Sequence, residues 1–103
     1  MQSILLLVGS TPESEAARRA FSLATALLRA GHRVSLALLE DAVRGALPGR
    51  SLPAGELGGV ALSDDLAMRG WGQAPLRPGF SACSYEDLVD LLVAEGTKVM
   101  GVF

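Results

Sequence analysis

The sequence has very little of the residues on which metal and disulfide chemistry depend. Its 103 residues include one cysteine, Cys83, one histidine, His32, and one lysine, Lys98. A single cysteine cannot form an internal disulfide or a multi-cysteine metal site, and a single histidine leaves zinc without its usual set of ligands. We therefore expect no metal and no cofactor. A Ser–His–Asp triad cannot be argued from this sequence either.

A basic surface and a membrane-spanning segment are also absent from the sequence. The formal net charge is −2, and the arginines are spread along the chain instead of being clustered. This balance does not favour nucleic-acid binding. No apolar run approaches the ~20 residues of a transmembrane helix, and the first residues lack the basic region and cleavage site of a signal peptide. We expect a cytoplasmic protein with no membrane partner.

Apolar residues are plentiful, although few are aromatic. Half of the residues are hydrophobic and 5% are aromatic, which allows a core of Leu, Val and Ala. This length is typical of a single domain, here residues 1–103, that buries roughly 60–70% of its unfolded surface. Part of the apolar excess is then available for a subunit interface.

The first forty residues predict a strand, a helix and a second strand. The apolar run at 3–8 lacks alternation, as in a parallel strand that is covered on both faces. Residues 12–30 place apolar side chains at helical spacing. Thr11 is the expected N-cap and Pro12 the first helical residue, while Gly31 ends the helix. A second apolar run, at 33–39, completes a βαβ unit.

The rest of the chain adds shorter units of the same kind. Glycines and prolines indicate a surface loop at 48–59 and an irregular segment at 71–78. We expect Ser63 and Ser84 to cap helices. The remaining expected elements are a helical turn at 42–47, strands at 60–62, 80–83 and 98–103, and helices at 63–69 and 84–95. The predicted fold class is α/β: a single three-layer α/β/α domain with a mainly parallel five-stranded sheet.

Polar residues follow the first two predicted strands, where open α/β sheets carry their sites. The candidate binding residues are Gly9, Ser10, Thr11, Glu40 and Asp41. A glycine between a strand and a helix suggests a cradle for a small anion or a nucleotide. The loop matches neither GxGxxG nor GxxxxGK[ST], however. The acidic pair is better explained as the solvated start of a helix that carries favourable charge.

Cys83 is the one residue capable of thiol chemistry. It precedes the expected N-terminus of the last helix, where the helix dipole favours a thiolate that could carry a sulfane sulfur. Glu86, Asp87 and Asp90 follow closely and disfavour a second negative charge. Free cysteine is also commonly a small buried hydrophobic residue, so a structural role is the alternative to a catalytic one.

Three segments resemble the DsrE/DsrF/DsrH superfamily, which includes the Tus sulfur-relay subunits. The first helix and second strand correspond to ARRAFSLATALLRAGHRVSLALLEDAV, which ends in a turn similar to that family's [QE]DGV. The next strand and its "DLxxRG" helix correspond to ALSDDLAMRGW, and the final helix and edge strand to SYEDLVDLLVAEGTKVMGVF. The likeness spans nearly the whole chain and is nearest the DsrH/TusB branch.

This resemblance implies a small α/β subunit that assembles into homo- or hetero-oligomers. Several family members pass persulfide sulfur between cysteines, so a second copy, related subunits and a sulfurtransferase are the implied partners. The family's carrier cysteines stand near the helix start that corresponds to residues 62–63, or in the first helix. This chain has no cysteine at either place, and Ala42 replaces the glycine of the turn.

Two hypotheses of function follow. The first is an accessory or sulfur-relay subunit of an oligomeric assembly, with Cys83 as the one possible persulfide carrier. The alternative is a module that binds a small anion or nucleotide at residues 9–13 and performs no sulfur chemistry.

Overall fold

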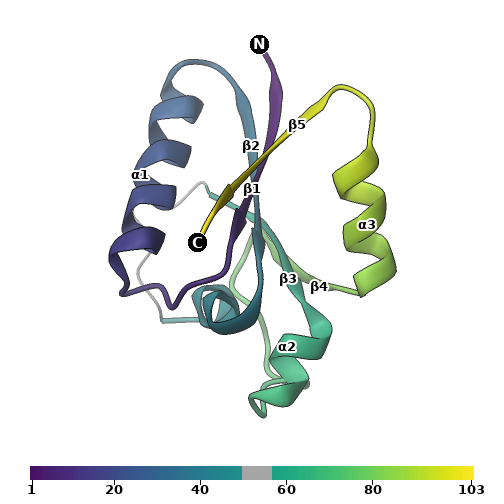
Figure 1. The fold of residues 1–103 in the computed structure, drawn as a ribbon. Coiled ribbons are helices and arrows are strands. Elements are labelled where there is room, and N and C mark those ends of the chain that lie inside the picture. Colours follow the sequence, from purple (N-terminus) through teal and green to yellow (C-terminus); the bar gives the residue numbers. More distant parts are fainter. Residues whose placement is uncertain (50–56) are drawn as a thin grey trace.

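A five-stranded parallel sheet forms the centre of the protein (Figure 1). The computed structural model describes residues 1–49 and 57–103, so part of the loop expected at 48–59 lies outside the described residues. The strands are β1 (Ser3–Val8), β2 (Arg33–Leu38), β3 (Gly59–Leu62), β4 (Phe80–Cys83) and β5 (Thr97–Val102). Their order is β4-β3-β2-β1-β5, and every pair is parallel. The predicted fold class is confirmed.

Helices lie on both faces of this sheet. They are α1 (Glu15–Arg29), the 3₁₀ helix η1 (Glu40–Ala46), α2 (Ser63–Met68) and α3 (Tyr85–Val93). Figure 1 shows α1 against one face and α3 against the other. Strand order explains this placement. From β1 to β4 the chain steps outward in one direction, whereas α3 carries it back across the sheet to β5. Crossovers of one hand that run in opposite directions cover opposite faces.

The larger hydrophobic core lies on the α1 face. There, α1, η1 and α2 all contribute buried side chains. Large residues that are almost wholly buried come from β1, β2, α1 and η1: Leu6, Val8, Phe21, Leu36, Leu38 and Val43. Burying each such side chain is worth about 1.5–3 kcal/mol relative to leaving it exposed. The opening βαβ unit therefore supplies most of the side chains that stabilise the fold.

The core on the α3 face is smaller. Its buried members are Leu5, Ala37, Leu62, Cys83 and Leu88. Leu88 is the single buried residue of α3, and β5 contributes no buried residue among those described. This face of the sheet is therefore less completely covered than the other.

The structure corrects two expected helix starts. Helix α1 begins at Glu15, and its cap is Ser14, whose Oγ accepts the N–H of Ala17 at 3.1 Å. Thr11 is not the cap, because its hydroxyl donates to the Glu13 carboxylate at 2.7 Å. Pro12 accordingly lies in the turn before the helix.

The start of α2 also differs from expectation. Leu62 occupies the cap position without a side-chain hydrogen bond, and Ser63 is the first helical residue. The strand before it therefore runs directly into the helix. The expected cap of α3 is confirmed, since Ser84 Oγ accepts the N–H of Asp87 at 3.1 Å.

A prediction concerns the close approach of β3 to β2. Gly59 has a φ of 154°, and a Cβ atom there would lie 1.9 Å from the carbonyl oxygen of Leu36. We expect Gly59→Ala to lower the free energy of unfolding by more than about 3 kcal/mol, because the backbone of two paired strands would have to move. Urea unfolding followed by circular dichroism measures this loss.

Gly70→Ala is the matched control. Gly70 has a φ of 81° but no atom within 4 Å of the added Cβ. It should cost only the about 1–2 kcal/mol of a left-handed non-glycine residue. Equal losses in the two variants would show that the contact between β2 and β3 is not the constraint at Gly59.

Candidate functional site

The glycine loop after β1 is tied to η1 by an ion pair. Thr11 donates its hydroxyl to Oε2 of Glu13, and the Arg44 guanidinium donates to Oε1 of the same carboxylate at 2.8 Å. Arg44 lies on η1, which follows β2, so the pair connects the carboxyl ends of two neighbouring strands. The structure therefore brings the two predicted binding segments, 9–13 and 40–41, to one edge of the sheet.

The aromatic ring of Phe103 occupies the space that a side chain at Gly9 would need. A Cβ atom at Gly9 would lie 2.4 Å from Cδ1 of Phe103, and a Cβ at Gly101 would lie 2.8 Å from Cε2 of the same ring. Glycine at both positions allows the ring to lie against the backbone of β1 and β5. The absence of a side chain at Gly9 is thus explained by an aromatic contact, and the phosphate-cradle interpretation is not needed to explain it.

The acidic pair at the start of η1 is bound to α2. The N–H of Glu40 donates to Oδ2 of Asp65 at 2.7 Å, and Glu40 itself has a φ of 51°. Arg69 donates to Oδ1 of Asp41 through Nη2 at 2.9 Å and Nε at 3.3 Å. Positive φ is unusual for a residue other than glycine and often marks a constrained position. Here the hydrogen bond to the Asp65 carboxylate constrains the backbone of Glu40.

Together these contacts form an edge network, which we define as Glu13, Arg44, Asp41, Asp65 and Arg69. Its carboxylates range from well exposed, as in Asp41, to mostly covered, as in Asp65. Pairs this close to solvent each contribute at most about 1 kcal/mol. The network therefore fixes the relative positions of the loop after β1, η1 and α2 more than it stabilises the fold.

Three members of the edge network were not among the residues predicted from sequence. Asp65 and Arg69 stand at a helical i,i+4 spacing, which was a usable local signal. Arg44 and its partner Glu13 are far apart in sequence, and only the parallel pairing of β1 with β2 brings them together. Nε of Arg44 is buried and has no hydrogen-bond partner in the described structure.

Cys83 is not a member of this edge network, although it also lies at the carboxyl end of a strand, where it pairs with Leu62 of β3. It ends β4, which is separated from β1 by β3 and β2. Its side chain is buried at 7% exposure in the α3-face core, with Leu62 and Leu88. Burial raises the pKa of the Cys83 thiol, and the negative charge of Asp87 raises it further. The dipole of α3, which would favour thiolate, does not prevail at this position.

The described residues offer no group for a metal. In the ranges 1–49 and 57–103, no three His, Cys, Asp or Glu side chains are placed to hold an ion. None of the helices in those ranges is long and apolar enough to cross a membrane.

Comparison with known families identifies the group to which this protein is related. A family model described as "DsrH like protein" matches residues 13–98. The chain belongs to the DsrH-like family. The resemblance found in the sequence is thereby confirmed. The matched range includes the acidic pair at 40–41 and Cys83 but begins after Gly9, Ser10 and Thr11.

The fold of this DsrH-like chain is shared with a protein of known structure. The crystal structure of the YchN protein from E. coli superimposes with a TM-score of 0.78, at 22% sequence identity. The match covers 97% of this chain and 100% of the YchN chain. At this level of identity the comparison establishes the fold. No curated protein matches the sequence of this DsrH-like chain.

A second prediction concerns the thiol of this DsrH-like protein. Replacing Asp87 by Asn removes the nearby negative charge that raises the pKa of Cys83. We expect the pKa to fall toward its ordinary value and the alkylation rate near pH 8 to rise about two- to fivefold, the usual strength of one solvent-exposed charge interaction. Iodoacetamide labelling followed by intact-mass analysis measures the rate, because the chain has one cysteine.

Asp90→Asn is the matched control, since it removes the same charge from the same helix. Asp90 is not among the groups that shift the pKa of Cys83. Equal acceleration in both variants would show that the general charge of α3, and not the contact with Asp87, governs the thiol.

Proposed function

We propose that this protein is an accessory subunit of a sulfur-relay assembly, which docks with related subunits and does not itself carry persulfide on Cys83. The observation that carries this proposal is the contrast between a buried thiol and exposed apolar side chains on the same side of the sheet. DsrH-like family membership supports the sulfur-relay setting. The proposed location is the cytoplasm, where a fold without disulfides is usual.

Persulfide transfer requires a thiolate that a partner can reach. The thiolate is the nucleophile, and reactive cysteines occupy partly exposed, electropositive surroundings. Cys83 has the opposite environment, because it is buried among leucines and its pKa is raised by burial and by Asp87. A structural role for this residue is therefore better supported than a carrier role.

Apolar side chains are exposed mainly on α3 and β5. Of the nine large hydrophobic residues that are exposed in the described structure, six lie on these two elements or directly after β5: Tyr85, Val89, Leu91, Val93, Val99 and Phe103. We call these six residues the α3–β5 surface. The concentration of exposed hydrophobic residues on two consecutive elements supports an interaction site, whereas single exposed hydrophobic residues need no explanation. We propose a second copy or a related DsrH-like subunit as its partner.

The alternative site at residues 9–13 is less well supported. The hydroxyl of Thr11 is donated to Glu13, the Glu13 carboxylate accepts from Arg44, and the ring of Phe103 lies over Gly9. An anion at this loop would have to displace these contacts and would meet a carboxylate. We therefore propose the α3–β5 surface, and not the loop at residues 9–13, as the functional site.

A third prediction tests the role of Cys83. We expect no gain of sulfur when the native protein is incubated with a sulfurtransferase and a persulfide donor and its intact mass is measured. The positive control is the double variant Ser63→Cys/Cys83→Ala, which moves the thiol to the start of α2, where relatives of this family carry theirs. Ser63 is partly exposed, so this variant should accept one sulfur atom.

The opposite result would identify a carrier. If the native protein gains one sulfur atom and Cys83→Ser does not, then the thiol becomes accessible during the reaction and the accessory role is wrong.

A fourth prediction tests the α3–β5 surface. We expect sedimentation velocity at micromolar concentration to show an oligomer that Val93→Lys weakens at least tenfold in dissociation constant, because the substitution puts a charge into an apolar contact. Val93 is 72% exposed in the single chain, so the substitution should leave the fold intact. Circular dichroism verifies this.

Leu23→Lys is the matched control. Leu23 is exposed on α1, on the other side of the sheet. A native protein that sediments as a monomer would refute self-association, and equal weakening by both variants would show that the effect of the added charge is not specific to the α3–β5 surface.

A further inference from the structure

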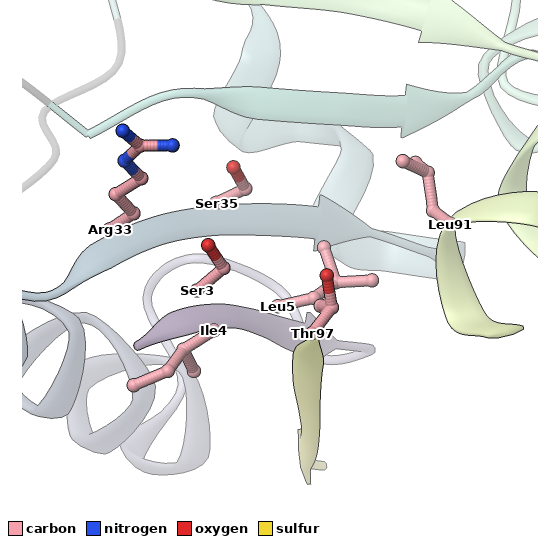
Figure 2. A pocket seen from close by; sticks show the side chains of 7 residues that line it. All are labelled: Ser3, Ile4, Leu5, Arg33, Ser35, Leu91 and Thr97. Atoms are coloured by element: carbon pink, nitrogen blue, oxygen red, sulfur yellow. The ribbon is translucent and has the colours of Figure 1, made fainter. Parts of the chain in front are cut away.

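A small hollow lies at the end of the sheet where the strands begin, opposite the carboxyl ends that carry the edge network. It is formed at the amino ends of β1, β2 and β5, and Leu91 from the last turn of α3 closes one side (Figure 2). Its volume is about 180 Å³. The lining residues are Ser3, Ile4, Leu5, Arg33, Ser35, Leu91 and Thr97. None of these residues belongs to the edge network.

Strand register places the polar residues of the hollow side by side. Ser3 pairs with Arg33 on β2 and with Thr97 on β5, and Leu5 pairs with Ser35. Paired residues of neighbouring strands point to the same face of a sheet, and alternate residues of one strand do so too. Figure 2 shows the three hydroxyls and the guanidinium on one side of the strands, whereas Ile4 points to the other side.

The polar side chains of the hollow have no hydrogen-bond or ion-pair partners among residues 1–49 and 57–103. Among the described residues, no hydrogen bond or ion pair engages the side chains of Ser3, Ser35 and Thr97 or the guanidinium of Arg33. No carboxylate lines the hollow. Within the part of the chain that the structure describes, no carboxylate pairs with the Arg33 guanidinium, in contrast to the arginines of the edge network.

Leucine side chains form the apolar part of the hollow. Leu5 is 3% exposed and belongs to the α3-face core, and Leu91 is 38% exposed at the rim. A ligand that filled the hollow would meet Ser3, Arg33 and Thr97 along one row of paired residues. The next row contains Leu5 and Ser35, and Leu91 of α3 lies at the rim. A cavity of this size holds the volume of about six water molecules.

We propose that this hollow binds a small organic acid, a carboxylate with an apolar tail of a few carbon atoms. Arginine presents two parallel N–H donors that match a carboxylate, and the hydroxyls can donate to its remaining lone pairs. The leucines favour a short hydrocarbon tail over inorganic phosphate, which would leave apolar surface in contact with charge. The hollow shares Leu91 with the α3–β5 surface, but the proposal does not depend on the proposed function, because binding of the acid requires neither the Cys83 thiol nor an assembled subunit.

The test is a titration of the native protein, in its own oligomeric state, with butyrate at constant ionic strength. Amide chemical shifts in ¹⁵N-labelled protein report the position of binding. We expect saturable shifts at residues 3, 33, 35 and 97. Butylamine, butanol and inorganic phosphate should produce no saturable shift at these positions.

Two arginine variants make the test specific. Arg33→Gln should raise the dissociation constant for butyrate about tenfold or more, as expected when a charged hydrogen-bond donor is lost. Arg18→Gln removes the same charge from the exposed side of α1 and should leave the dissociation constant unchanged. Both positions are exposed, so neither substitution should disturb folding.

Several results would overturn the proposal. These are shifts that grow linearly without saturation, equal binding of butylamine or phosphate, or equal effects of the two arginine variants. The absence of any shift in the native protein would overturn it as well, including the case in which a neighbouring subunit covers the hollow.

Discussion

The central position of β1 is the constraint on which the rest of this structure depends. β1 pairs with β2 on one side and β5 on the other, although β5 is the last strand of the chain. The chain must therefore place β2, β3 and β4 in turn on one side of β1 and then cross back over the sheet once to place β5 on the other side. Because parallel crossovers keep one hand, the outward connections gather on one face and the single return lies on the other.

This constraint explains why the two faces differ. On the α1 face, α1, η1 and α2 all pack against the sheet, and the core there contains Phe21, Leu36 and Val43 at 2% exposure or less. On the α3 face, the nine-residue helix α3 must cover five strands. The incomplete cover leaves apolar side chains exposed on α3 and β5 and leaves the hollow at the amino ends of the strands. Both proposed binding surfaces have the same geometric cause.

The same geometry separates what sequence could predict from what it could not. The strands and α1 were predictable because each rests on local patterns, an apolar run or a helical spacing. The N-cap of α1 was not, since Thr11 and Ser14 are both suitable residues and the choice depends on the contact between Thr11 and Glu13. The edge network and the hollow join residues from separate segments, and only strand register brings those residues together.

Cys83 shows how magnitudes decide between opposing local signals. Its position before α3 predicts a lowered pKa, because charge at a helix end is worth about 0.3–1 kcal/mol at exposed sites. Burial can shift a pKa by several units, and one unit is equivalent to about 1.4 kcal/mol, so desolvation outweighs the dipole once the side chain is covered. The return crossing places Leu88 of α3 and Leu62 of β3 with this sulfur in one buried cluster. The same fold thus leaves the α3–β5 surface exposed and buries the thiol of Cys83, and both features support the proposed accessory role over a carrier role.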